Sequence, residues 1–249
     1  MAPRAVGGKT RAPEPPPSVP VRGRSSGARS SRAKSAITQQ RLRWATARLL
    51  QEKALRELKV ADITSLAAVA PATFYVYFAD VNEAVLAVIE DAYQVQPDFA
   101  AMVAAFNRET LEADVRAYVT AYLAYWNQHY ALLRVRNLAA DEGDQRFRAA
   151  RNRALMPALR AMAAKIQTFR SEALCAKDVR PMALATVIAG LMERLGPIVH
   201  VRPQGRDLSR RRLVDAAVLM ISETIDPRSV PPDPTRDPQA GPATLNRAR

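Results

Sequence analysis

The sequence predicts an all-α protein, and three observations support this prediction. Apolar residues in the central part of the chain recur at spacings of three and four, as in Leu155, Leu159 and Met162, which places them on one helix face. Alternation of apolar and polar residues at every second position, typical of half-buried strands, is hard to find. Prolines in the central part mostly fall where the apolar pattern begins or breaks, as expected at helix boundaries.

The helical pattern predicts a series of elements between the two ends of the chain. The first has an apolar face made by Leu42, Ala45 and Leu49, and Pro157 predicts a break or kink in the longest. The predicted helices span 37–56, 61–68, 71–78, 82–95, 98–106, 110–127, 129–141, 144–174, 180–199 and 207–225.

The net charge of +13 is unevenly distributed along the 249 residues. Residues 1–35 contain 8 Lys and Arg against one acidic residue, and this segment together with 227–249 contains 12 of the 18 prolines. Neither end has enough apolar residues to offset the entropy lost on ordering. We therefore expect a disordered basic arm over 1–35 and a disordered proline-rich tail over 227–249.

Composition limits the chemistry that the chain can perform. Its 48% apolar residues are enough for one large core or two small ones. The single cysteine, Cys175, excludes an internal disulfide framework and a cysteine-rich zinc site, and two histidines leave little for a histidine-based metal centre. We therefore expect no metal and no cofactor, and a reducing compartment fits best.

No membrane partner is expected. The longest apolar stretch, 182–192, is well short of the roughly 18 residues that span a bilayer. The N-terminus has no apolar segment of the kind found in secretory signal peptides. The expected location is the cytoplasm.

The segment 61–78 has the pattern of two short helices joined by a tight turn. The run of small residues 67–70 permits close contact between the helices, and Pro71 suits the first position of the second one. Phe74 and Phe78 are four residues apart and are expected in the core, which leaves the hydroxyl-bearing Thr73, Tyr75 and Tyr77 on outward faces. A helix-turn-helix presents such a helix to the DNA major groove.

The sequence VADITSLAAVAPATFYVYFADVNEAVLAVI resembles the helix-turn-helix signature of the tetracycline-repressor (TetR-like) transcriptional regulators. The resemblance implies a DNA-binding domain over 36–82 and a helical ligand-binding and dimerisation domain over 83–226. The residues that it places at DNA are Arg41, Pro71, Ala72, Thr73, Tyr75 and Tyr77.

Three positions depart from the pattern of the family. Ala68 stands where a turn glycine is common, which matters if the backbone there needs a positive φ. Ala70 occupies the place of a capping serine, and Val81 replaces a frequent lysine that contacts phosphate. The arginines of the N-terminal arm are a hypothetical replacement for that lost charge.

An aromatic cluster in the second domain has two interpretations. It is either ordinary core or, as the resemblance implies, the wall of an inducer pocket, where phenol, indole and imidazole groups orient a ligand. The candidate ligand-binding residues are Met102, Phe106, Tyr118, Tyr122, Tyr125, Trp126, Asn127, His129 and Tyr130.

The last two predicted helices are apolar on two faces, so each is expected to be buried on two sides. The resemblance implies a homodimer in which these helices pair across a two-fold axis; the alternative is burial within one subunit. The candidate interface residues are Leu184, Ile188, Leu191, Leu195, Val214, Val218 and Ile221.

These observations predict a dimeric, sequence-specific DNA-binding regulator, most often a repressor, that a small molecule releases from a palindromic operator. One alternative is a basic protein that binds nucleic acid non-specifically through its arm. An all-α enzyme is less favoured, because the chain has no nucleophile elbow, phosphate loop or zinc-protease motif.

Overall fold

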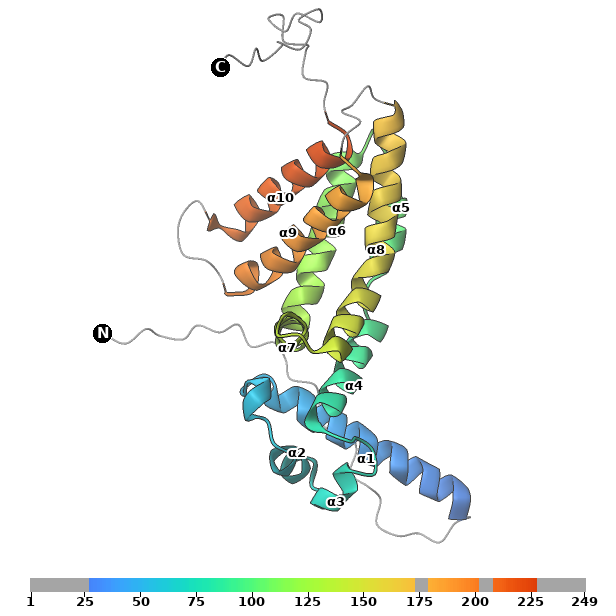
Figure 1. The fold of residues 1–249 in the computed structure, drawn as a ribbon, viewed down its shortest axis with the longest axis vertical. Helices are drawn as coiled ribbons and strands as arrows, with labels where there is room; N and C mark the ends of the chain where they lie inside the picture. The colour runs from blue at the N-terminus through green and yellow to red at the C-terminus, as the bar shows by residue number, and fades with distance from the viewer. Residues whose placement is uncertain (1–26, 173–178, 202–207, 228–249) are drawn as a thin grey trace, which may run out of the picture.

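The computed structural model describes residues 27–172, 179–201 and 208–227 (Figure 1). These ranges contain helices and no strand, so the all-α prediction is confirmed. The elements are α1 (Gly27–Leu49), the 3-10 turn η1 (Leu55–Glu57), α2 (Val60–Ala67), α3 (Pro71–Phe74), α4 (Val81–Gln94), α5 (Phe99–Ala104), α6 (Leu111–Gln128), α7 (Tyr130–Asp141), α8 (Gln145–Glu172), α9 (Pro181–Val201) and α10 (Arg210–Ile225).

The helices form two stacked bodies with separate cores. Helices α1 to α3 lie at one end of the molecule, α5, α6, α9 and α10 lie at the other, and α4 leads from one to the other (Figure 1). The upper core contains buried residues of α5 to α10, including Trp126, Ile166 and Met192. The lower core contains buried residues of α1 to α4, but also Val135 of α7 and Phe147 of α8. The second body therefore contributes side chains to the core of the first.

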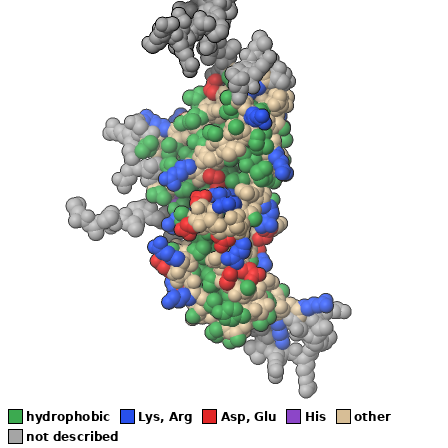
Figure 2. All heavy atoms as spheres, viewed as in Figure 1, with side chains coloured by type: hydrophobic (Ala, Val, Ile, Leu, Met, Phe, Trp, Pro, Cys, Tyr) green, Lys and Arg blue, Asp and Glu red, His purple; other side chains and the backbone are tan. Residues whose placement is uncertain are grey.

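Acidic and basic side chains gather around the middle of the face shown in Figure 2. Three ion pairs connect α4, or the residue before it, to neighbouring helices. Arg43 of α1 contacts Asp91 of α4 at 2.5 Å, and Arg153 of α8 contacts Glu90 of α4 at 2.9 Å. In the third, Arg146 of α8 lies 3.1 Å from Asp80, the residue before α4. Helix α4 is thus tied to both bodies.

The first helix starts earlier than the sequence pattern predicts. It begins at Gly27 instead of residue 37, so residues 27–35, which composition assigns to a disordered arm, are helical. The physical reason is that this stretch contains no proline and several alanines, arginines and a lysine, which favour helix. The rest of the predicted arm and all of the predicted tail except Pro227 lie outside the described residues.

Two other boundaries differ from the prediction. Helix α3 ends at Phe74, and the chain continues in turns in which the backbone N–H groups of Tyr77 and Phe78 both donate to the Phe74 carbonyl at 3.0 Å. Phe74 and Phe78 are nevertheless both buried, as expected. The predicted break at Pro157 does not interrupt α8, which runs through it.

One helix of the described part, α9, is long and apolar enough to cross a membrane, with a mean hydropathy of 1.5 over 18 residues. This is weak support for a membrane protein, because a core helix of a soluble protein has the same composition. In the structure, α9 packs against α6, α8 and α10.

Candidate functional site

The turn between α2 and α3 requires a left-handed residue. Ala68 has φ +51° and ψ +51°, the only positive φ of a non-glycine residue in the described part of the chain. Its N–H donates to the Ser65 carbonyl at 3.1 Å, and the N–H of Val69 donates to the Thr64 carbonyl at 3.0 Å, which ends α2. The departure from glycine at this position therefore leaves a strained alanine in the turn.

Helix α3 begins without a side-chain cap. Ala70 has an extended backbone and no side chain that can accept a hydrogen bond, whereas Pro71 fits the first helical position. The helix is held instead by Phe74 and Phe78, whose rings pack 5.5 Å apart in the lower core. Packing, more than capping, positions this short helix.

The outward surface of α3 and the turn after it contains most of the residues predicted to contact DNA. Pro71, Ala72 and Tyr75 are exposed, and Tyr75 keeps 62% of its surface. Thr73 is half-buried. Val76, with 74% exposure, belongs to the same surface but was missed, because an apolar residue in this pattern suggests core.

Tyr77 and Arg41 lie differently from the other four predicted DNA contacts. Tyr77 is half-buried, and its hydroxyl donates to the Ser35 hydroxyl of α1 at 3.1 Å, so it fixes α1 against the chain after α3. Arg41 is half-buried on α1. On the same helix, Arg32 and Lys34 are exposed.

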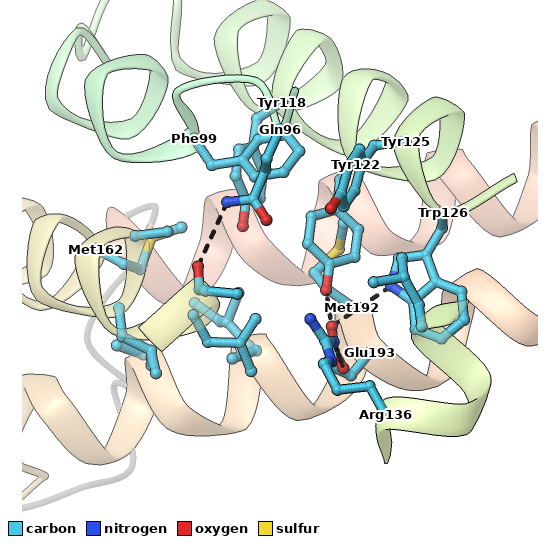
Figure 3. Close-up of a pocket in the computed structure, with 18 residues that line it drawn as sticks. Gln96, Phe99, Tyr118, Tyr122, Tyr125, Trp126, Arg136, Met162, Met192 and Glu193 are labelled. Carbon is cyan, nitrogen blue, oxygen red and sulfur yellow. Dashed lines mark hydrogen bonds and ion pairs between the residues drawn. The ribbon is translucent and has the colours of Figure 1, made fainter. Parts of the chain in front are cut away.

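A small cavity lies in the upper body between α6, α8 and α9 (Figure 3). Aromatic rings of Phe99 and of four residues of α6 form one wall, and aliphatic side chains of α8 and α9 form the other. The cavity volume is only about 20 Å³, room for about one water molecule. Its polar lining consists of Gln96, Arg136 and Glu193 together with the tyrosine hydroxyls and the Trp126 ring nitrogen.

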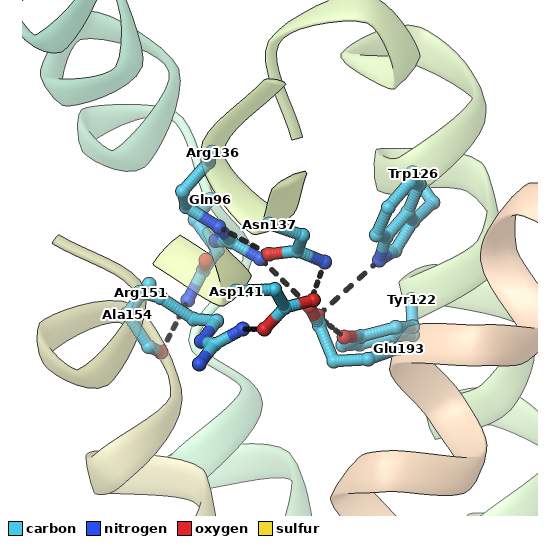
Figure 4. Close-up of polar contacts among 9 residues, drawn as sticks. All are labelled: Gln96, Tyr122, Trp126, Arg136, Asn137, Asp141, Arg151, Ala154 and Glu193. Atoms are coloured by element: carbon cyan, nitrogen blue, oxygen red, sulfur yellow. Dashed lines mark hydrogen bonds and ion pairs between the residues drawn. The ribbon is translucent and has the colours of Figure 1, made fainter. Parts of the chain in front are cut away.

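Glu193 is the centre of a buried polar cluster at this cavity (Figure 4). Its Oε2 accepts from Arg136 Nη2 at 2.9 Å and from Asn137 Nδ2 at 2.5 Å. Its Oε1 accepts from the Tyr122 hydroxyl and, at 3.4 Å, from Trp126 Nε1. Side chains from α6, α7 and α9 therefore meet at one carboxylate.

The tyrosines of the cavity remain protonated. Burial raises the pKa of Tyr125 to about 12. Burial, together with the Glu193 carboxylate, also raises the pKa values of Tyr118 and Tyr122. All three phenols therefore keep their protons at physiological pH, and those of Tyr122 and Tyr125 are donated to Glu193 and to the Ala92 carbonyl.

Four of the nine predicted ligand-binding residues line the cavity: Tyr118, Tyr122, Tyr125 and Trp126. The other five do not line it, and for all nine a role in ligand binding stays a prediction. Phe106 is buried in the upper core and Met102 packs against that core, but neither lines the cavity.

Asn127, His129 and Tyr130 miss the cavity because they follow the end of the aromatic face of α6. The Asn127 side-chain oxygen lies 2.9 Å from His200 Nδ1, and the Tyr130 ring stacks on His200 at 3.7 Å. His129 contacts the ring of Tyr125, with centroids 4.8 Å apart.

Several cavity residues were missed by the sequence analysis. Arg136 and Glu193 each occupy a position where a lone charge in a helix suggests a solvated face, and Gln96 falls between two predicted helices. Phe99, Met162 and Met192 are apolar residues in helical patterns, but the pattern does not distinguish a residue of a cavity wall from an ordinary core residue.

The residues of the predicted dimer interface lie mostly inward in a single subunit, and their role in an interface stays a prediction. Ile188, Leu195, Val218 and Ile221 are each less than 7% exposed and belong to the upper core of one subunit, so they have almost no surface to offer a partner. Leu184, Leu191 and Val214 are half-buried against the same core. The exposed apolar residues of α9 and α10 lie on their other faces and are Met182, Val187, Ile198, Val201, Leu219 and Met220.

Within the described residues, no group of His, Cys, Asp and Glu side chains is arranged to hold a metal ion. The polar groups around Glu193 already pair with one another, as Figure 4 shows.

Known proteins share this architecture. Residues 107–200 match the family model described as the tetracyclin repressor-like C-terminal domain. A protein of Rhodococcus sp. assigned to the TetR-family transcriptional regulators has a similar structure, with a TM-score of 0.56 and 15% sequence identity over 74% of this chain and 98% of that one. A protein of Saccharomonospora viridis assigned as a transcriptional regulator, crystallised in complex with choline, gives a TM-score of 0.53 and 16% identity over 76% and 96% of the two chains.

No curated protein sequence matches the chain significantly. The structural likenesses are at low identity and therefore concern the fold. Together with the helix-turn-helix and the match over the second body, they lead to one conclusion. The protein is TetR-like: it has the all-helical fold of the TetR-family transcriptional regulators, and its residues 107–200 match their C-terminal domain.

Proposed function

We propose that the protein is a homodimeric repressor that binds a palindromic DNA operator through α3 and is released from it by a small molecule. The observation that supports this most is the surface of α3. The short helix and the turn after it are anchored by the buried Phe74 and Phe78. They present the half-buried Thr73 and the exposed Tyr75 and Val76 at one end of the molecule.

These side chains have suitable chemistry for a DNA groove. The hydroxyls of Thr73 and Tyr75 can donate to phosphate oxygens, which fixes the position of the helix on the duplex. Ala72 and Val76 can contact thymine methyl groups. Arg32 and Lys34, exposed on the first part of α1, add positive charge that attracts the phosphate backbone.

Dimerisation is supported by the uncovered apolar faces of α9 and α10. Val187 and Val201 are each 70% exposed, and Leu219 and Met220 are each 57% exposed. Apolar side chains at such exposure mark a protein interface in many soluble proteins. If these faces pair across a two-fold axis, the dimer has two copies of α3. A palindromic operator needs two such helices, one for each of two successive major grooves about 34–36 Å apart.

Coupling between ligand and DNA is supported by contacts between the cavity wall and α4. The Tyr125 hydroxyl donates to the carbonyl of Ala92 in the last turn of α4 at 3.2 Å. Gln96, two residues after α4, donates to the carbonyl of Ala154 in α8 at 3.4 Å. A ligand that moves these side chains also moves the end of the helix that leads to the DNA-binding body. It would release DNA if it binds the DNA-incompetent arrangement more tightly. The choline complex of the Saccharomonospora viridis protein supports a small-molecule site in this fold.

Fluorescence anisotropy tests DNA recognition directly. The labelled DNA is taken from upstream of the protein's own gene, and scrambled DNA serves as competitor at physiological salt. We expect binding that scrambled DNA does not compete, a large loss in Tyr75→Ala, and little change in the control Leu138→Ala, which removes an exposed apolar side chain of α7.

Equal affinity for both DNAs would contradict the proposal. It would favour the alternative of a basic protein that binds nucleic acid without sequence preference. That alternative is tested by the salt dependence, because purely electrostatic binding disappears as salt is raised.

A further inference from the structure

The cavity contains one buried charge of each sign, and the two compensate each other. The Arg136 side chain is 3% exposed and that of Glu193 is 14% exposed, with Nη2 and Oε2 2.9 Å apart. A buried ion pair costs desolvation free energy that packed apolar residues would not cost. Its charge balance also determines which ligands the cavity can accept.

The two partners differ in their remaining capacity for hydrogen bonds. Glu193 accepts from four donors, which fills the acceptor sites of a carboxylate. Arg136 has five N–H bonds, and the structure records acceptors for only Nε and Nη2. Within the described residues, Nη1 has no hydrogen-bond partner, although Arg136 is almost fully buried and lines the cavity. This nitrogen is not among the fully buried side-chain atoms that lack a partner, so it keeps some accessible surface and can donate to an acceptor that enters the cavity.

We propose that the cavity binds an uncharged, largely apolar molecule whose carbonyl oxygen accepts a hydrogen bond from Arg136 Nη1. This deepens the proposed function, on which it rests, by naming the class of ligand. A carboxylate ligand would leave one uncompensated negative charge beside the saturated Glu193. An organic cation would leave one positive charge that Glu193 has no free lone pair to receive. Either uncompensated charge is costly in a buried site.

The remaining lining suits the apolar part of such a molecule. Five aromatic rings and the aliphatic side chains of α8 and α9 surround the space (Figure 3). The cavity must widen to admit a ring, since its present volume is about 20 Å³. Met162 on α8 and Met192 on α9 provide flexible thioether side chains that can change rotamer for this purpose.

Four probes of similar size separate the possible ligand charges. They are acetophenone, with a neutral carbonyl; ethylbenzene, without an acceptor; benzoate, an anion; and benzyltrimethylammonium, a cation. Isothermal titration calorimetry on the full-length protein measures each Kd. We expect acetophenone to bind at least about tenfold more tightly than the other three, as one hydrogen bond from a charged donor predicts.

Two conservative variants test the roles of the two residues. Arg136→Lys keeps the positive charge beside Glu193 but removes Nη1, so the ratio of the ethylbenzene Kd to the acetophenone Kd should fall to near one. Glu193→Gln leaves Arg136 uncompensated, so benzoate should become the tightest of the four probes. The control Arg148→Lys, at an exposed position of α8, should keep the wild-type order.

The order of the four Kd values for the wild-type protein tests the proposed ligand class even if a variant does not fold. Tighter binding of benzoate or of the cation overturns the proposal. So does acetophenone that binds no better than ethylbenzene, including the case in which neither binds. Release of operator DNA is measured separately: acetophenone that binds preferentially but leaves DNA affinity unchanged supports this inference and contradicts ligand-controlled release.

Discussion

Ala68 is held in a left-handed conformation by the hydrogen bonds that end α2. An alanine in this region loses about 1–2 kcal/mol relative to glycine, and glycine returns part of this through its larger unfolded-state entropy. Ala68→Gly should therefore raise the free energy of unfolding by about 0.5–1 kcal/mol. Urea denaturation measures this as a higher midpoint with an unchanged slope.

The matched control for this substitution is Ala113→Gly, at an exposed position inside α6. Its backbone is helical, so the same change should lower stability by about 1 kcal/mol. Equal destabilisation by both substitutions would mean that the turn does not need a left-handed residue.

Gly196 of α9 lies directly against the indole ring of Trp126. A Cβ atom at this position would be 2.5 Å from two ring carbons. Gly196→Ala should therefore lower the free energy of unfolding by about 1–3 kcal/mol, as overpacking of a core does. Gly190→Ala is the control, because a Cβ there meets no heavy atom within 4 Å.

Thermal unfolding followed by circular dichroism compares the two glycine variants. A decrease in Tm for Gly196→Ala alone is the expected result. If both variants melt like the wild type, the ring of Trp126 has room to move, and the cavity wall is softer than the structure indicates.

Some residues of the cavity were predictable and others were not. Tyr118, Tyr122 and Trp126 share one helix, so their spacing places them together before any tertiary contact is known. Arg136 and Glu193 are 57 residues apart and lie on different helices. Each alone has the appearance of a surface charge, and only the packing of α7 against α9 brings them into one pair.

At the scale of elements, the start of α4 combines a cap with a link to α8. Asp80 Oδ1 accepts from the Glu83 N–H at 2.7 Å, and Oδ2 lies 3.1 Å from Arg146 Nη1. The hydrogen bond from Glu83 lowers the pKa of Asp80, and Arg146 lowers it further. Because the folded state binds this proton less readily than the unfolded chain, the stabilisation is present above the ordinary pKa of a carboxyl. It is lost as the pH falls through the lowered value.

Asp80→Asn separates these two roles. Asparagine keeps the cap acceptor but does not titrate, so stability should fall less steeply below about pH 4 than in the wild type. Asp80→Ala should cost about 0.5–2 kcal/mol at neutral pH through loss of the cap. Denaturant midpoints measured across pH test both statements; parallel pH curves for the wild type and Asp80→Asn would refute the role of the charge.

The exposed faces of α9 and α10 allow a direct test of assembly. In the double variant Val187→Glu/Leu219→Glu, two like charges would enter the centre of the proposed interface and be desolvated there. We expect a monomer by sedimentation velocity and a fall of at least about a hundredfold in operator affinity, because half-sites then bind independently. Leu138→Glu, on the exposed face of α7, is the control and should remain dimeric. A double variant that is still dimeric would place the interface elsewhere.

The apolar pattern identified these helices but not their orientation. Both α9 and α10 are apolar on two faces, and periodicity alone does not tell which face meets its own subunit. The structure places Ile188 and Val218 inside, and it leaves Val187 and Leu219, their immediate neighbours, outside. In the same way, the pattern predicted the helices but not all of their ends, since α1 begins at Gly27, ten residues before its predicted start at residue 37.

At the scale of the whole molecule, the two bodies share structure. Phe147 of α8 is fully buried in the lower core, next to residues of α1 to α4. Ion pairs from α1 and α8 hold α4 from both sides. The lower core therefore includes side chains of α7 and α8, and we expect the stability of the body formed by α1 to α3 to depend on these two helices.

This arrangement predicts that the two bodies unfold together. The two tryptophans report on them separately: Trp44 packs against the lower core and Trp126 is buried in the upper core. Trp44 is the only tryptophan left in Trp126→Phe, and Trp126 is the only one left in Trp44→Phe. We expect the single remaining tryptophan and the circular dichroism signal to give the same urea midpoint within each variant, as for one cooperative transition.

A third substitution makes the test sharper. Phe147→Ala removes a side chain that α8 contributes to the lower core and should cost about 3–5 kcal/mol. If the bodies are coupled, this substitution lowers the midpoint reported by Trp126 in the upper core as much as that reported by Trp44. A change seen by Trp44 alone, or two separate transitions in the parent variants, would show that the bodies unfold independently. In that case the contacts through α7 and α8 would be too weak to transmit ligand binding to α3.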